Sequence, residues 1–146
     1  MSVAVDKLLD MSKAELDDLF HESPAGETPG GDGRGTVVFA PGSRLSEPVA
    51  RLAYLVAWQG KVFDPGRGEL LNKVSPFGVR AIRAKIYKAP SWFDGDESIV
   101  LDYSRTSVVA HWIRDEIRNV GPGTYLGIVY LRRARVLRFV LEFPVP

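Results

Sequence analysis

Asp115 is the carboxylate in this chain whose setting most suggests chemistry. It belongs to an alternating run, residues 113–120, of the kind that is typical of a β-strand. On a strand it shares one face with Ile113, Ile117 and Asn119. The opposite face carries three charged residues that we expect to meet solvent: Arg114, Glu116 and Arg118. Asp115 and Asn119 are therefore predicted to point inward, among apolar groups.

A carboxylate among apolar groups has a limited set of explanations. It can act as a general acid or base, anchor a polar group of a ligand, or form an internal ion pair with a basic residue of another strand. A bulge that turns it outward is a further alternative. Four basic residues are candidate partners: Lys61, Lys73, Arg83 and Lys85. Alternation places Arg83 and Lys85 on the outside and leaves the side of Lys61 open.

Two tyrosines are candidates to work with Asp115. Tyr103 and Tyr125 each share a strand face with aliphatic residues. A tyrosine hydroxyl in a pocket can donate a hydrogen bond to a ligand carbonyl, and capping of a core is the alternative. If the chain is an enzyme, the catalytic candidates are Asp115, Tyr103 and Tyr125. The side chains expected to contact a ligand are the following: Trp58, Lys61, Asn72, Asn119, Tyr130 and Trp112.

The sequence offers little support for metal or cofactor chemistry. It has no cysteine, and its two histidines, His21 and His111, are too far apart for a metal-binding motif. The glycines of residues 30–35 lack the lysine and helix of a phosphate loop, and no serine has the context of a nucleophile elbow. We expect neither a metal nor a cofactor.

Composition indicates one soluble globular domain. The chain has 146 residues, of which 45% are hydrophobic and 25% charged. No apolar run approaches the roughly 20 residues that span a bilayer. Residues 1–13 lack the pattern of a signal peptide, so a cytoplasmic location without a membrane span is expected.

Charge is distributed unevenly along the chain. Residues 1–33 carry eight acids and two lysines, whereas the remainder carries seventeen basic residues and ten acids. This indicates two solvated surfaces, an acidic arm that packs on a basic body, or a body that attracts an anion. Four arginines are interpreted as a solvated hairpin tip, with binding of anionic lipid headgroups as an alternative: Arg132, Arg133, Arg135 and Arg138. Because few aromatic residues accompany them in sequence and the arm is acidic, nucleic acid is not an expected partner.

Two helices are predicted before the strands. Ser12 and Glu15 form a capping box that predicts a helix ending near His21. Residues 23–35 are rich in glycine and proline and are predicted to be a loop. Ser46 is expected to begin the second helix. We divide the chain into an acidic helix and linker, residues 1–35, and a β-barrel domain, residues 36–146.

Short alternating runs follow one another through the rest of the chain. Tight turns between them predict an antiparallel meander. Seven to nine such strands favour an up-and-down barrel, which at about eight strands can hold one small ligand. The predicted class is therefore α+β and mostly β, with one or two helices before the barrel. The predicted strands are 36–40, 58–63, 69–74, 80–87, 91–94, 98–103, 113–120, 124–131 and 136–143, with one helical turn over 108–112.

The run from Trp58 to Phe63, Trp-Gln-Gly-Lys-Val-Phe, resembles the Trp-x-Gly-Lys-x-Phe run of bacterial GXWXG-type proteins. These belong to the lipocalin-like (calycin) superfamily. A charged strand over residues 113–118, a turn and the Leu-Gly strand of residues 125–130 are also similar. The resemblance covers about residues 50–143, and Val56 stands where the motif has its first glycine. It implies a lipocalin-like barrel that holds an apolar small molecule, with Trp58 closing one end of the barrel or lining its floor.

The function predicted from the sequence is binding of an apolar or amphipathic small molecule inside the barrel. Two alternatives stay open. One is a small-molecule cyclase or isomerase in which Asp115 is the acid or base. The other is a structural or interaction module whose barrel is filled by its own side chains. A homodimer is compatible with each of these.

Overall fold

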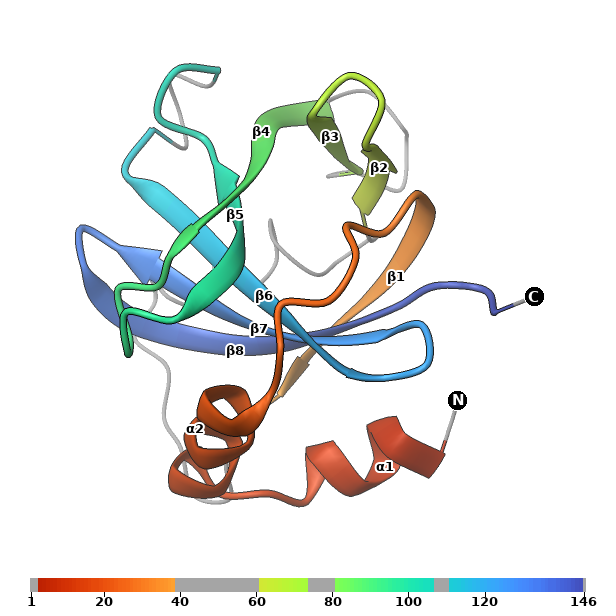
Figure 1. Cartoon of the computed structure of the whole chain (residues 1–146), viewed down its shortest axis with the longest axis vertical. Coiled ribbons are helices and arrows are strands. Elements are labelled where there is room, and N and C mark those ends of the chain that lie inside the picture. Colours follow the sequence, from red (N-terminus) through yellow and green to blue (C-terminus); the bar gives the residue numbers. More distant parts are fainter. Residues whose placement is uncertain (1–2, 39–60, 74–80, 107–110, 146) are drawn as a thin grey trace.

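The computed structural model describes residues 3–38, 61–73, 81–106 and 111–145. In these residues eight antiparallel strands form a closed barrel in the order β1 to β8, with β8 pairing back to β1 (Figure 1). Two helices precede it, α1 (Val3–Leu9) and α2 (Lys13–Glu22). The strands are β1 (Gly31–Val38), β2 (Lys61–Asp64), β3 (Glu69–Lys73), β4 (Ala81–Pro90), β5 (Glu97–Asp102), β6 (Ile113–Gly121), β7 (Thr124–Leu131) and β8 (Ala134–Glu142).

The predicted class, a mostly β protein with an antiparallel barrel after N-terminal helices, is confirmed. Two local predictions were wrong. β1 begins at Gly31, inside the segment predicted to be a loop, because its backbone pairs with β2 and β8 despite the glycines. Residues 91–94 form a turn rather than a strand, since Gly95 at a φ of +79° lets the chain reverse there. Trp58, the helix predicted from Ser46 and residues 108–110 lie outside the described residues.

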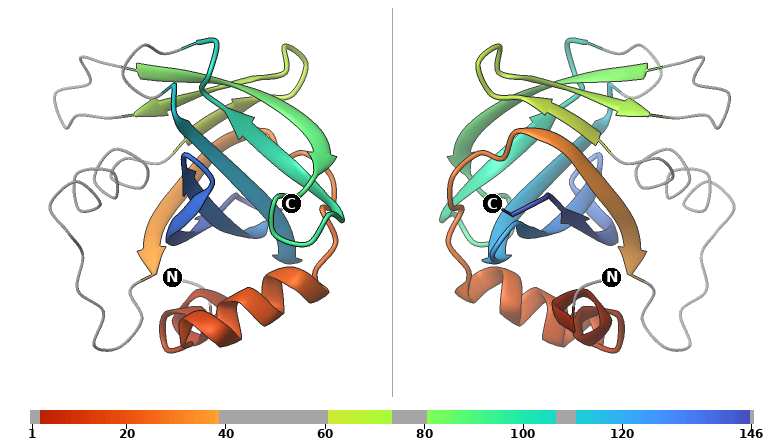
Figure 2. Two further views of the ribbon diagram at one scale, coloured as in Figure 1. Left: turned by 90° about the vertical axis from the view of Figure 1, so that its left-hand side faces the viewer. Right: turned by 90° about the vertical axis from the view of Figure 1, so that its right-hand side faces the viewer.

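Helix α2 begins with the predicted capping box. The Ser12 Oγ accepts a hydrogen bond from the backbone N–H of Glu15 at 3.1 Å, and the Glu15 carboxylate accepts one from the backbone N–H of Ser12 at 3.2 Å. The helix then buries Leu16 and Phe20. Helices α1 and α2 pack against the outer faces of β1, β7 and β8, as Figure 2 shows. The apolar residues of this contact are Val5, Leu8, Leu16, Phe20, Val38, Leu126, Ile128, Tyr130 and Val140.

The barrel interior is lined by the inward residues of the strands, which form a second buried cluster. Two glycines of the strands, which have no side chain, let aromatic rings pack directly on the backbone of the barrel. A Cβ on Gly127 would overlap the ring of Phe139, the residue that pairs with it across β7 and β8. Gly33 is likewise covered by the ring of Phe143. These rings lie over the backbone of the opposite strand and fill space inside the barrel wall.

The segment between α2 and β1 crosses one end of the barrel (Figure 1). Ala25 joins the interior cluster. The Pro24 carbonyl accepts a hydrogen bond from the Asn119 backbone N–H at 2.9 Å, and the Glu27 carbonyl accepts one from the Tyr125 hydroxyl at 2.6 Å. This segment thus covers the end of the barrel at which β6 and β7 meet. Within the described residues, no helix has the length and hydropathy needed to cross a membrane.

Candidate functional site

A buried polar group lies inside the barrel and joins three elements. Lys61 begins β2, Tyr103 follows β5, and Asp115 lies in β6. The Lys61 ammonium donates a hydrogen bond to the Tyr103 hydroxyl at 2.9 Å, and that hydroxyl donates to Asp115 Oδ2 at 3.3 Å. Lys61 Nζ also lies 3.5 Å from Asp115 Oδ2. We name these three residues the interior triad.

The interior triad is shielded from water. The side chains of Lys61 and Asp115 have no exposed surface, and Tyr103 is 3% exposed. The Lys61 ammonium also lies 5.6 Å from the centre of the Tyr103 ring and 5.7 Å from that of Phe139. Ring faces attract a cation, so they partly replace its lost hydration. The polar group is thereby held in an otherwise apolar interior.

Burial shifts the two charged members of the triad in opposite directions. It lowers the pKa of Lys61 and raises the pKa of Asp115, because each charged form loses its hydration. The attraction between Lys61 and Asp115 and their hydrogen bonding oppose both shifts. Perturbed pKa values of this kind occur at functional sites and also in structural ion pairs.

Asp115 retains unused hydrogen-bonding capacity. Its Oδ2 atom contacts Tyr103 and Lys61, whereas its buried Oδ1 atom has no hydrogen-bond partner in the described part of the chain. A buried carboxylate oxygen left without a donor costs free energy, about 1–3 kcal/mol or more. The atom is therefore able to accept one further hydrogen bond.

Asp115 and Tyr103 point into the barrel, as the alternation along their strands predicted. The structure also resolves the open question about Lys61, which points inward and pairs with Asp115. The internal ion pair considered from the sequence is thus present. The structure does not bring Tyr125 to this group, since its hydroxyl binds the Glu27 carbonyl at the barrel end. Asn119 lies at the same end, where its side chain contacts Gly26.

Two other predicted ligand contacts lie outside the barrel. Tyr130 belongs to the outer cluster under the helices, and its ring packs edge-on against Trp92 at 5.3 Å. Trp112 is 54% exposed. Asn72 pairs through its backbone with Lys61, directly across β2 and β3, and its side chain is not among those described. Trp58 lies outside the described residues. The fold brings together three residues of the predicted site: Lys61, Tyr103 and Asp115.

The prediction that Glu116 and Arg118 face solvent was wrong, since neither side chain has exposed surface. Both point outward from the barrel, but the turn after β4 and helix α2 cover them. Glu116 accepts hydrogen bonds from the Ser91 hydroxyl and from the Trp92 backbone N–H at 3.0 Å. It also pairs with Arg114 at 3.0 Å. A charged strand face can thus be an internal one when other segments of the chain cover it.

Arg118 joins α2 to the barrel. Its guanidinium binds both oxygens of Asp94, at 2.7 and 2.6 Å, and donates to the Phe20 carbonyl at 2.8 Å. It also lies 4.3 Å from the centre of the Phe20 ring. Asp17 of α2 in turn pairs with Arg135 and Arg138, both at 3.0 Å. The acidic arm therefore packs on the basic body, which was one of the alternatives that the charge distribution left open.

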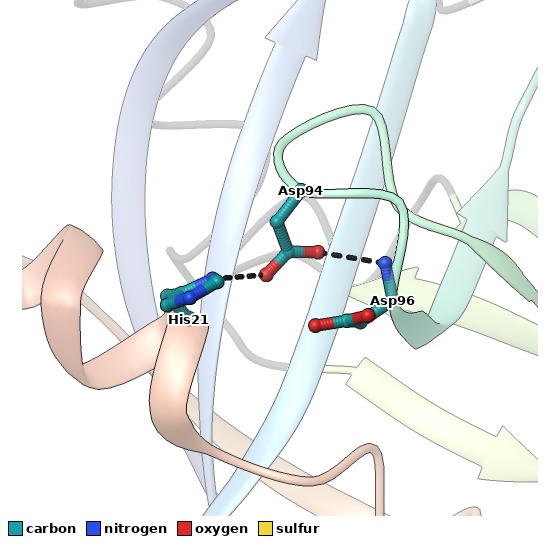
Figure 3. Close-up of side chains that lie close together, drawn as sticks. All are labelled: His21, Asp94 and Asp96. Carbon is teal, nitrogen blue, oxygen red and sulfur yellow. Dashed lines mark hydrogen bonds and ion pairs between the residues drawn. The ribbon is translucent and has the colours of Figure 1, made fainter.

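His21, Asp94 and Asp96 lie close enough together to suggest a metal site (Figure 3). The two oxygens of Asp94 are already occupied, by Arg118, by the His21 Nδ1 at 2.9 Å and by the Asp96 backbone N–H at 3.0 Å. The Arg118 guanidinium holds the pKa of Asp94 well below its usual range. A cation would have to displace that fixed positive charge, so we assign the cluster a structural role in holding α2.

Comparison with known proteins supports the fold. No protein-family model matches the chain, and no curated protein matches it. Among solved structures, it is similar to a crystal structure of a protein from Thermomonospora curvata, with 18% sequence identity and a TM-score of 0.64. The match covers 97% of this chain and 96% of that one. At this identity the likeness shows the fold alone, and membership of the calycin superfamily stays a prediction.

Proposed function

We propose that the barrel binds one small amphipathic molecule, whose polar end meets the interior triad. The observation that carries this proposal is the Oδ1 atom of Asp115, which has no hydrogen-bond partner among the described residues and is buried among apolar residues inside a closed barrel. A ligand with an O–H or N–H donor would satisfy that atom. Its apolar body would contact the aliphatic and aromatic side chains of the interior cluster.

The resemblance to lipocalin-like proteins agrees with this proposal, because the ligands of such proteins bind in the interior of the barrel. The chemistry of the triad narrows the class of ligand further. The Tyr103 hydroxyl donates to Asp115 Oδ2 and the Lys61 ammonium lies 3.5 Å from the same oxygen, so a ligand donor is favoured at Oδ1. A ligand that carries only acceptors would leave Oδ1 unsatisfied.

A neutral fluorescent probe tests the proposal. N-phenyl-1-naphthylamine has an apolar body and one N–H donor, and its emission rises when it leaves water. We expect it to bind the wild-type protein and a copy with Ala134→Met, a change at an exposed position. Ala84→Met should abolish binding, since Ala84 is a fully buried member of the interior cluster.

Native mass spectrometry of the protein from its own host provides the second readout. A bound mass that is lost in the Ala84→Met variant, while that variant still melts cooperatively, would support an interior ligand. A wild-type protein that carries no adduct and gives no probe signal would show a filled barrel. That result would favour the structural or interaction module instead.

A second candidate function is acid–base catalysis on the bound molecule. The opposite pKa shifts of Lys61 and Asp115 favour it, because one residue can accept a proton while the other donates one. A cyclisation or isomerisation needs little beyond shape and such a pair. Asp115→Asn should then abolish turnover of the copurified molecule while its binding persists. Equal turnover by the variant would exclude this role.

A further inference from the structure

Arginine and tryptophan side chains alternate on the outer surface beside the turn between β7 and β8. The Arg132 guanidinium lies 3.9 Å from the centre of the Trp112 ring. The Trp92 ring is contacted by Arg114 at 4.2 Å and by Arg133 at 4.3 Å. We name these five residues the arginine–tryptophan face. The segments that carry them, at the β4–β5 turn, the start of β6 and the β7–β8 turn, lie on the left in Figure 1.

The tryptophans of this face are unusually exposed. Trp112 has 54% and Trp92 38% of its surface open to solvent. They are two of the four large hydrophobic residues that are exposed in the described ranges. Exposed aromatic residues set among charges are typical of a surface that binds a partner.

The turn that holds Arg132 and Arg133 is an unfavourable place for arginine. Leu131 pairs with Ala134 across it, so it is a two-residue hairpin turn. Arg132 has a φ of 51° and Arg133 a φ of 74°, in the left-handed region that Asn-Gly normally occupies in such turns. The Arg132 backbone N–H binds the Trp112 carbonyl at 3.1 Å, which fixes the turn against that residue. Strained positions of this kind are found most often where a side chain serves a function.

The positive charges of Arg132 and Arg133 in the turn are not neutralised by a carboxylate of the described residues. Arg118, Arg135 and Arg138 each pair with an aspartate. By contrast, neither Arg132 nor Arg133 forms an ion pair with a carboxylate of the described residues. Arg114 is the one member of the face with such a partner, Glu116. The face therefore presents two cations, Arg132 and Arg133, stacked on partly exposed tryptophan rings.

We propose that the arginine–tryptophan face binds single-stranded nucleic acid. Unpaired bases stack on tryptophan rings and guanidinium planes, and phosphates pair with arginine. An acidic peptide would match the charge of Arg132 and Arg133, but its carboxylates would not stack on the guanidinium and indole planes that this face exposes. The sequence did not suggest nucleic acid, because the arm is acidic and because Trp92 and Trp112 are distant along the chain from Arg132 and Arg133, which the fold brings to them.

Fluorescence anisotropy with labelled single strands of about 12 nucleotides tests this proposal. DNA and RNA strands are measured separately, with a duplex and polyglutamate of similar length as comparisons. The first variant is Arg132→Asn with Arg133→Gly, which places the favoured Asn-Gly pair in the turn and should fold at least as stably. The second is Trp112→Ala. The matched control is Arg34→Gln with Arg67→Gln, two exposed arginines on β1 and in the β2–β3 turn.

We expect the wild-type protein and the control to bind DNA or RNA single strands within about two-fold of each other. The turn variant and Trp112→Ala should each bind about ten-fold more weakly. The turn variant should also lower the slope of log affinity against log salt by about 1.4. No binding by wild type, equal weakening by control and turn variants, or equal affinity for polyglutamate would overturn the proposal.

Discussion

Lys61 Nζ and Asp115 Oδ2 lie 3.5 Å apart inside the barrel, and neither side chain has any exposed surface. Such a pair is expensive, because both ions lose their hydration and recover only part of it from each other. Apolar residues of similar volume could fill the same space at lower cost. We therefore interpret the pair, with Tyr103 bridging it, as a feature kept for binding rather than for stability.

Removing one member of the pair should destabilise the fold, and removing both should not. Lys61→Met and Asp115→Leu should each destabilise the fold by about 3–5 kcal/mol, since each leaves one buried charge without its partner. The double variant should be as stable as the wild type or up to about 4 kcal/mol more stable. Urea unfolding of the four proteins measures these differences.

The exposed pair of Lys88 and Glu97 provides the matched control, with its charged atoms 4.0 Å apart. A cycle of Lys88→Met and Glu97→Leu should give a coupling energy of about 0–1 kcal/mol. If the interior cycle gives a coupling as small as the surface one, then Lys61 and Asp115 do not interact as the structure indicates.

Removal of the Tyr130 hydroxyl should not destabilise the fold, in contrast to the single substitutions of Lys61 and Asp115. This hydroxyl is buried with no hydrogen-bond partner in the described ranges, and burial together with Glu116 raises the pKa of Tyr130 to about 12. The hydroxyl therefore stays protonated and unsatisfied at neutral pH. Tyr130→Phe should leave stability unchanged or raise it by about 1 kcal/mol, as thermal melting would show.

Tyr103→Phe is the comparison for Tyr130→Phe, because it removes a hydroxyl that accepts from Lys61 and donates to Asp115. It should cost about 1–3 kcal/mol. A similar loss from both variants would mean that the Tyr130 hydroxyl has a partner after all.

The stability that α2 gains from packing on the barrel should depend on pH, because Asp94 must be ionised to pair with Arg118. Hydrogen bonds from Arg118 lower the pKa of Asp94 below its ordinary 3.8. A lowered pKa gives stability that is present above the ordinary value and is lost as the pH falls toward the folded value. Asp94→Asn should cost about 1–3 kcal/mol at pH 7, and this difference from the wild type should shrink below about pH 4.

Urea unfolding at several pH values between about 7 and 2 follows this difference. Asp18→Asn is a suitable comparison, since Asp18 is exposed on α2, and it should change stability little across the range. If the cost of Asp94→Asn were constant with pH, the carboxylate charge of Asp94 would not be what holds Arg118.

Alternation along the strands was enough to predict the fold and two of the three members of the interior triad. Period 2 decides the side of each residue once one face of a strand is known, so Asp115 and Tyr103 were placed inward from their own neighbours. Lys61 was not, because β2 is short and its flanking residues do not distinguish the two faces. Its side is set by pairing with β1 and β3, which a single run of sequence does not contain.

The outer face of β6 was misread for a related reason. Glu116 and Arg118 form part of a charged face, which on an isolated strand would meet solvent. Their burial is set by α2 and by the turn after β4, segments distant in sequence that bring Phe20, Ser91 and Asp94 to them. The opposite charges of the arm and the body were the one sign of this contact, and they did not identify its residues.

The most direct test of the interior site compares two probes that differ in a single donor. N-phenyl-1-naphthylamine carries an N–H, and its N-methyl derivative does not. If Asp115 Oδ1 receives the ligand donor, the wild-type protein should bind the first about 10–100-fold more tightly. The variant with both Lys61→Met and Asp115→Leu should bind the two probes equally. Equal affinity of the wild-type protein for the two probes, or no binding of either, would contradict the proposed site.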